Sequence, residues 1–162
     1  MRKLLVAAAC VSVLASVALA QTQMETKWHC PKATAAEKYD VGDPGGHAYA
    51  IEQGTCNSTT SNAGEKSGAF TESLEWAKTS FATHGRMIVT MENGDQTYYA
   101  YDGTGDMARK SAAIKWKIAG GTGKHKTTKA TGSCTGSFND DGTSDFVCTG
   151  TIAPAAAAAA NK

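Results

Sequence analysis

The chain has 162 residues, of which 19% are charged, and its formal net charge is +1; this length fits one domain. A near-neutral chain without a basic block excludes an electrostatic footprint for nucleic acid. It also lacks the polybasic segment that would hold a protein on an anionic membrane surface. We therefore expect no nucleic-acid partner, and the sequence leaves the oligomeric state open.

The first twenty residues predict a secretory signal peptide. Met1 to Lys3 is basic, Leu4 to Val17 is an apolar run broken only by two serines, and Ala18-Leu19-Ala20 places small residues before Gln21. No apolar stretch continues past Ala20, which favours a cleaved leader over a membrane span. We expect domain boundaries at 1–20 for the leader, 21–153 for the folded domain and 154–162 for a disordered, alanine-rich tail. Removing the leader lowers the formal charge to −1, because Arg2 and Lys3 leave with it.

The first half of the mature chain predicts mixed local structure. Thr34 to Tyr39 indicates a short helical turn, and His47 to Cys56 alternates like a strand. Asn57 to Gly68 is polar and typical of a loop. Gly68 to Gly85 fits either a helix or a strand, and we favour a strand followed by a loop because the surrounding sequence is rich in strands.

A β-hairpin is predicted from Arg86 to Tyr101. Asn93-Gly94 is the preferred pair for a two-residue type I′ turn. With that turn, Arg86 faces Tyr101, and one side of the hairpin carries Arg86, Ile88, Thr90, Thr97, Tyr99 and Tyr101. Both sides are partly apolar, which suits a sheet covered on both faces or a closed barrel.

The second half continues with clear strand signals. Ser111 to Ala119 places Ile114, Trp116 and Ile118 on one face and two lysines on the other. Ala130 to Phe138 and Thr143 to Ile152 form the last predicted hairpin, with Cys134 and Cys148 opposite each other.

Four cysteines remain after the leader: Cys30, Cys56, Cys134 and Cys148. An even number in an exported chain predicts disulfides. Three pairings are possible, and we expect Cys30–Cys56 and Cys134–Cys148 because the second pair brackets a hairpin. No C-x-x-C or H-x-x-x-H spacing supports zinc, so we expect no metal and no cofactor.

The candidate ligand site is Arg86, Tyr99, Tyr101 and Trp116. If their face lines a barrel lumen, an arginine with two phenols and an indole could hold a small amphipathic or anionic molecule. The alternative is an outward face on which the arginine stacks on tyrosine.

Other constellations favour structural roles. The four histidines, His29, His47, His84 and His125, are scattered and lie beside no recognisable nucleophile. Gly120 to Lys124 lacks the complete phosphate-loop pattern, since His125 stands where serine or threonine is needed. Glu72 and Glu75 could form a carboxylate pair in a cleft beside Trp76, but they share a face only on a helix, and we favour a solvated pair. No catalytic residues are predicted.

The segment Ile118-Ala119-Gly120-Gly121-Thr122-Gly123-Lys124 follows one predicted strand and precedes another. It is similar to the G-G-T-G-K/R stretch of the allene oxide cyclase and dirigent superfamily of β-barrels, and to small secreted bacterial proteins with similar stretches. The resemblance covers roughly Gly85 to Ile152. It departs from the family at His125, where an aromatic residue is usual, and in a longer run from Lys126 to Thr131. No set of family active-site residues carries over to this chain.

We therefore expect an all-β, single antiparallel barrel of the calycin-like or allene oxide cyclase-like kind, stapled by two disulfides. The location is periplasmic or extracellular, in a bacterium to judge from the leader and tail. The favoured function is a non-enzymatic binding module for a small amphipathic molecule. The resemblance implies a cyclase or isomerase as one alternative, and an envelope structural or protein-interaction protein is the other.

Overall fold

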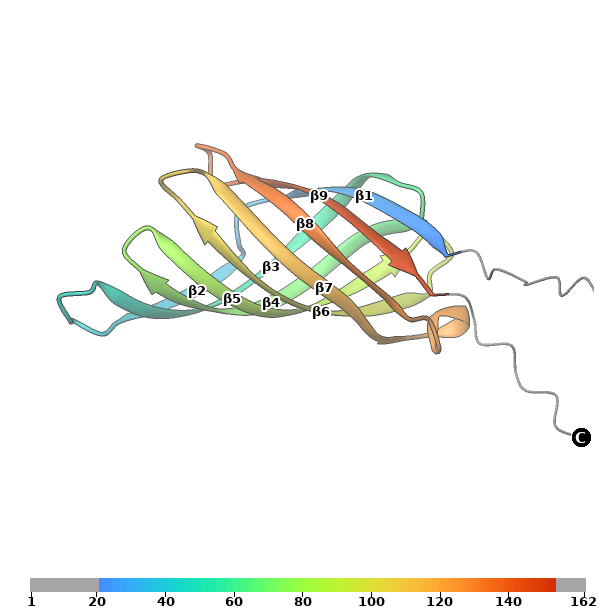
Figure 1. Cartoon of the computed structure of the whole chain (residues 1–162), viewed down its shortest axis with the longest axis horizontal. Helices are drawn as coiled ribbons and strands as arrows, with labels where there is room; N and C mark the ends of the chain where they lie inside the picture. Colours follow the sequence, from blue (N-terminus) through green and yellow to red (C-terminus); the bar gives the residue numbers. More distant parts are fainter. Residues whose placement is uncertain (1–20, 154–162) are drawn as a thin grey trace, which may run out of the picture.

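The computed structural model describes residues 21–153, which form one antiparallel barrel. The strands are β1 (Thr22–Cys30), β2 (Ala35–Asp40), β3 (His47–Ser61), β4 (Glu65–Ala77), β5 (Ser80–Met91), β6 (Gln96–Asp106), β7 (Ser111–Gly121), β8 (Ala130–Phe138) and β9 (Ser144–Ile152), with one 3₁₀ turn, η1 (Gly123–His125). The ladder runs from β1 through β9 to β3, and pairing of β1 with β3 closes it into eight strands. The short strand β2 pairs with the projecting part of β3 (Figure 1). This confirms the predicted all-β barrel.

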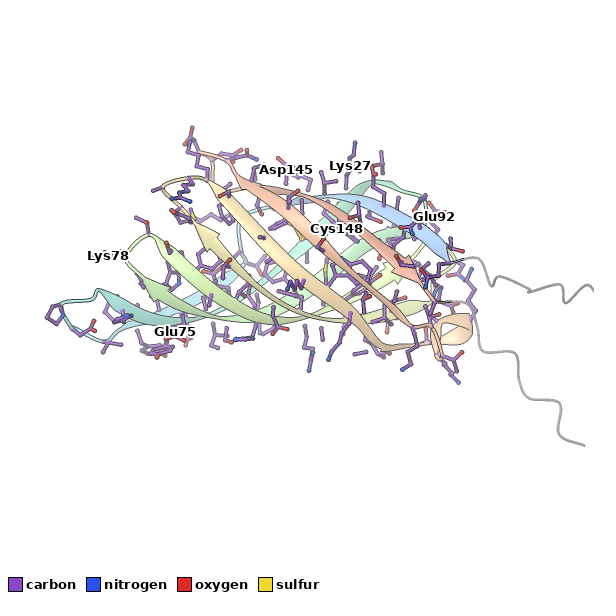
Figure 2. All side chains as sticks on the ribbon, viewed as in Figure 1. Lys27, Glu75, Lys78, Glu92, Asp145 and Cys148 are labelled. Atoms are coloured by element: carbon purple, nitrogen blue, oxygen red, sulfur yellow. A yellow bond between two sulfur atoms is a disulfide. The ribbon has the colours of Figure 1, made fainter. Side chains whose placement is uncertain are left out.

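Side chains alternate between lumen and solvent along the eight strands of the closed barrel, as a closed sheet requires, whereas β2 is exposed throughout. On β7, Ala112, Trp116 and Ile118 are buried, whereas Lys115 and Lys117 are exposed, as predicted. Charged residues such as Lys27, Glu75 and Asp145 lie on the outer surface (Figure 2). The barrel therefore has a mainly apolar interior and carries its lysines and arginines on the exterior.

Aromatic rings in the lumen lie over glycines of the neighbouring strand. Five such cross-strand partners are Phe70 with Gly54, Tyr101 with Gly85, Phe81 with Gly105, Trp116 with Gly132 and Phe146 with Gly136. A Cβ added at any of these glycines would fall 2.1–2.6 Å from an atom of the ring. Because glycine lacks that atom, each ring can rest on the barrel wall.

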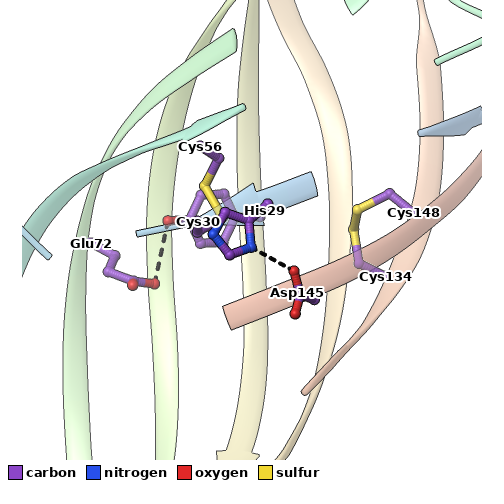
Figure 3. Close-up of a disulfide and its surroundings, with 8 residues drawn as sticks. His29, Cys30, Cys56, Glu72, Cys134, Asp145 and Cys148 are labelled. Carbon is purple, nitrogen blue, oxygen red and sulfur yellow. Dashed lines mark hydrogen bonds and ion pairs between the residues drawn. A yellow bond between two sulfur atoms is a disulfide. The ribbon is translucent and has the colours of Figure 1, made fainter. Parts of the chain in front are cut away.

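Both predicted disulfides are present: Cys30–Cys56 and Cys134–Cys148, each with a Cα–Cα distance of 4.0 Å. Cys134 and Cys148 are direct partners across β8 and β9, as the sequence predicts. Cys30–Cys56 joins β1 to β3, next to the last ladder partners His29 and Asn57. It therefore staples the seam at which the barrel closes (Figure 3).

Three local predictions are wrong. Thr34 to Tyr39 is not a helical turn, because it runs along the edge of β3 as β2. Most of Asn57 to Gly68 belongs to β3 and β4, with only a short turn between them. The strand predicted after Gly68 is present, but the loop expected before Gly85 is the first half of β5. In each case pairing with a neighbouring strand overrides the local composition.

The hairpin from β5 to β6 exists, but its predicted register is wrong by one residue. Its loop has three residues: the Met91 N–H donates to the Asp95 carbonyl (2.8 Å), and Gly94 has φ +85°. This is a type I turn followed by a left-handed glycine, the usual geometry of three-residue hairpins. Arg86 therefore faces Ala100, and Gly85 faces Tyr101. A shift of one residue moves every side chain of a strand to the other face.

The predicted leader at 1–20 and the tail at 154–162 lie outside the described residues. Within residues 21–153, no helix is long and apolar enough to cross a membrane.

Candidate functional site

The barrel encloses a cavity of about 300 Å³, at the lower end of the range for small-molecule sites. One end is open: there the cavity reaches Pro31 and Ala33 after β1, Met107 in the β6–β7 turn and Gly142 in the β8–β9 turn. The rest of the wall is formed mainly by aromatic and sulfur-containing side chains: Met24, Trp28, Phe70, Phe81, Met87, Tyr99, Tyr101, Trp116 and Phe146. Such a wall suits an apolar molecule.

The opposite end of the barrel is filled. Met91, Thr97, Ile118 and Ala130 are buried there and do not line the cavity. The Gln96 carbonyl and backbone N–H bond to Thr122, which leads into η1. The cavity is consequently a blind pocket entered from the end that carries Pro31 and Met107.

Glu65 lies at the deep end of the cavity and is only 4% exposed. The Thr26 hydroxyl donates to its carboxylate, and the Tyr99 hydroxyl donates to it at 2.5 Å. Thr26 itself is fully buried and lies 2.8 Å from the Ser61 hydroxyl. The carboxyl is thus fixed by hydroxyl groups rather than by a basic residue.

Glu72 forms a second carboxyl–hydroxyl cluster nearer the open end. The hydroxyls of Thr83 and Tyr101 donate to its Oε2 at 2.5 and 3.3 Å. The Tyr101 ring reaches this position over Gly85, and Figure 3 shows the Glu72 carboxyl. Glu52 is the direct cross-strand partner of Glu72 and also lines the cavity. Two carboxyl groups therefore face the same part of the lumen.

Burial changes the acidity of these groups. Desolvation raises the pKa of Glu65 and of Glu72, and the donated hydrogen bonds offset part of that rise. The pKa of Glu52 is raised first by burial and then by the nearby Glu72 carboxylate. Tyr99 and Tyr101 also have raised pKa values, because burial and the adjacent carboxylates disfavour a phenolate. The phenols therefore stay protonated and act as donors.

Three of the four predicted ligand residues lie together in the lumen. Tyr99 and Trp116 are buried, with their rings 5.3 Å apart in an edge-to-face arrangement, and Tyr101 lines the cavity beside them. Arg86 is exposed on the outer face, so the expectation that it shares a face with the tyrosines is wrong. The cause is the one-residue shift of the hairpin register described above.

Sequence reasoning missed the three lumenal carboxyl groups. The sequence pattern could have placed Glu52 in the lumen, because Glu52 alternates in phase with the buried Ala48 and Ala50. Glu65 was hidden in a predicted loop. Glu72 and Glu75 do point oppositely, as on a strand, but only Glu75 is exposed, so the predicted solvated pair is wrong for Glu72.

The histidines lie away from the cavity wall. Three of them bond aspartates on the outer surface: His29 with Asp145, His47 with Asp43 and His84 with Asp102, at 2.6–2.8 Å. No group of three or more His, Cys, Asp or Glu in the part of the chain that the structure describes could hold a metal ion. A more open depression of about 600 Å³ lies outside the barrel, beside His47 and Arg109. Because it is open to solvent, it encloses a ligand less well than the lumen.

The interior combines an apolar wall, fixed hydroxyl donors and three carboxyl groups. This arrangement can bind an amphipathic molecule and hydrogen-bond its polar end. No protein-family model matches the sequence, and no curated protein matches it.

Proposed function

We propose that this protein binds a small amphipathic molecule inside its barrel. The observation that carries the proposal is the blind cavity of about 300 Å³ with a mostly aromatic wall and convergent polar groups. A barrel of eight strands is just wide enough either to be filled by side chains or to hold one small ligand. Here the aromatic rings lie against the wall over glycines, which favours the second arrangement.

The entrance offers a direct way to test the site. Ala33 lies at the cavity mouth on the segment between β1 and β2, and its Cα is 3.5 Å from the position of a Cβ at Gly54. Ala33→Trp should obstruct the entrance without altering a strand. Ala35→Trp is the matched control, because Ala35 is exposed opposite Gln53 and does not line the cavity.

The experiment measures binding of the neutral fluorescent probe N-phenyl-1-naphthylamine to protein purified from an oxidising periplasm. Native mass spectrometry of the same sample records any molecule that copurifies. We expect saturable probe binding by the unaltered protein and by Ala35→Trp, and a loss of about tenfold or more in Ala33→Trp. Absence of both probe binding and copurifying mass, or equal binding by the two variants, would reject the lumen as a binding site.

A cyclase or isomerase is the second candidate. It is favoured by the lumenal glutamates Glu65 and Glu72, whose raised pKa values and fixed hydroxyl partners suit acid–base chemistry. If a bound molecule is identified, conversion of that molecule to an isomer by the unaltered protein but not by Glu72→Gln would support the enzyme. Release of the molecule unchanged would support the binding protein.

A further inference from the structure

The lumen and the outer surface of the barrel differ in charge. Every lysine and arginine within residues 21–153 is exposed. The three lumenal carboxyl groups, those of Glu52, Glu65 and Glu72, form no ion pair with any Lys, Arg or His of that range. His125 is close enough to Glu65 for its charge to lower the pKa of that carboxyl, whereas no basic group of the described residues acts on Glu52 or Glu72. The cavity therefore contains two acids, Glu52 and Glu72, without a protein cation to balance them.

Glu52 and Glu72 are placed to act together. They are direct partners on β3 and β4, and both line the cavity. Thr83 and Tyr101 donate to Glu72, and these donors hold its carboxyl in position. Two like charges directly opposite each other destabilise a sheet, so a cation between them would relieve repulsion that the protein itself does not neutralise.

The surrounding wall also suits a cation with an apolar body. The faces of tyrosine and tryptophan attract cations, more strongly where water is excluded. Tyr101 and Trp116 both line the cavity. Trp116 is 7% exposed, so a cation at its ring face would be largely shielded from water.

We propose that the lumen selects a lipophilic amine, whose ammonium group lies between Glu52 and Glu72 and whose apolar body lies along the aromatic wall. This inference rests on the proposed function, because it names the chemical class of the ligand for the same cavity. It also replaces the anionic ligand suggested by Arg86, since that guanidinium lies outside the barrel.

The experiment compares three probes with one apolar body: decylammonium, 1-decanol and decanoate. Binding is measured by calorimetry at a pH between neutral and about 8, where an alkylamine is protonated, and below the concentrations at which the probes form micelles. A charge-assisted contact predicts that decylammonium binds about tenfold more tightly than 1-decanol, and decanoate more weakly than either. The variants are Glu52→Gln and Glu72→Gln, with Glu75→Gln on the outer face of β4 as control.

We expect both lumenal variants to weaken decylammonium binding about tenfold and to leave 1-decanol binding nearly unchanged. Glu75→Gln should change neither. If 1-decanol and decanoate bind as tightly as the amine, the amine selectivity is rejected while the binding function stands. If none of the three probes binds, the proposed function fails and this inference fails with it. Loss of 1-decanol binding in the lumenal variants would also overturn the inference, since the carboxyl groups would then shape the cavity rather than select charge.

Discussion

The disulfide at the closing seam should contribute more to local closure of the barrel than the other disulfide. Cys30 and Cys56 are 26 residues apart, and Cys134 and Cys148 are 14 apart. In the chain-entropy model, loops of these lengths correspond to about 3.5 and about 3 kcal/mol of stability. The global effects of removing each disulfide are therefore similar, and the difference lies in the ladders that remain.

The ladder between β1 and β3 has only four partner pairs and contains a register irregularity between Lys27 and Trp28. The ladder between β8 and β9 has nine partner pairs. Without its disulfide, the β1–β3 ladder is held only by these four pairs, whereas the β8–β9 ladder keeps nine pairs without its own disulfide. Replacing Cys30 and Cys56 by alanine should accordingly open the seam locally as well as lower the free energy of unfolding.

The assay is urea denaturation followed by tryptophan fluorescence, combined with amide hydrogen exchange. We expect Cys30→Ala/Cys56→Ala to lose about 3.5 kcal/mol and to exchange faster in β1 and in Asn57–Ser61 of β3. Cys134→Ala/Cys148→Ala is the control, with a loss of about 3 kcal/mol and no selective acceleration in β8 and β9. A loss below about 1 kcal/mol for the seam variant, or equal local opening in both variants, would refute this reasoning.

Two further predictions concern packing and pH. Gly132→Ala should lower the free energy of unfolding by about 1–3 kcal/mol, because the new Cβ would lie 2.1 Å from the Thr149 carbonyl oxygen and 2.3 Å from Trp116 Cζ2. Gly120→Ala is its control, with its nearest contact at 3.5 Å from Tyr98, and should be neutral or stabilising by up to about 1 kcal/mol; equal losses in urea denaturation would contradict the packing argument. Burial raises the pKa of Glu72 above its ordinary value of 4.5. Between 4.5 and that higher pKa, the folded protein binds more protons than the unfolded chain, so its stability falls as the pH rises through this range. Urea denaturation across this range should show a shallower fall for Glu72→Gln, and identical slopes would show that Glu72 does not titrate abnormally.

The register of the β5–β6 hairpin could not be predicted from the sequence alone. Asn93-Gly94 predicts a turn, but the same dipeptide fits a two-residue type I′ turn and the end of a three-residue loop. The choice between them moved Arg86 out of the lumen and brought Met87, Val89 and Met91 to the inner face with Tyr99. One additional residue in the loop therefore removes the positive charge of Arg86 from the candidate site.

The sequence by itself determined the features that depend on neighbours along the chain. The alternation in β7 and the placing of Cys134 opposite Cys148 follow from strand periodicity and a nearby turn, and both are present. Strand alternation and hairpin signals likewise predicted an all-β fold, and the even number of cysteines predicted two disulfides.

Only the tertiary structure decided the features that depend on closure of the barrel. Closure turns Glu52, Glu65 and Glu72 toward one cavity, although they lie on stretches predicted as strand, loop and solvated surface. Strand pairing also places five of the aromatic rings over a glycine on the next strand, which leaves the lumen open. These contacts join residues far apart in the chain, and the inner face of a strand is defined only after all its neighbours are in place.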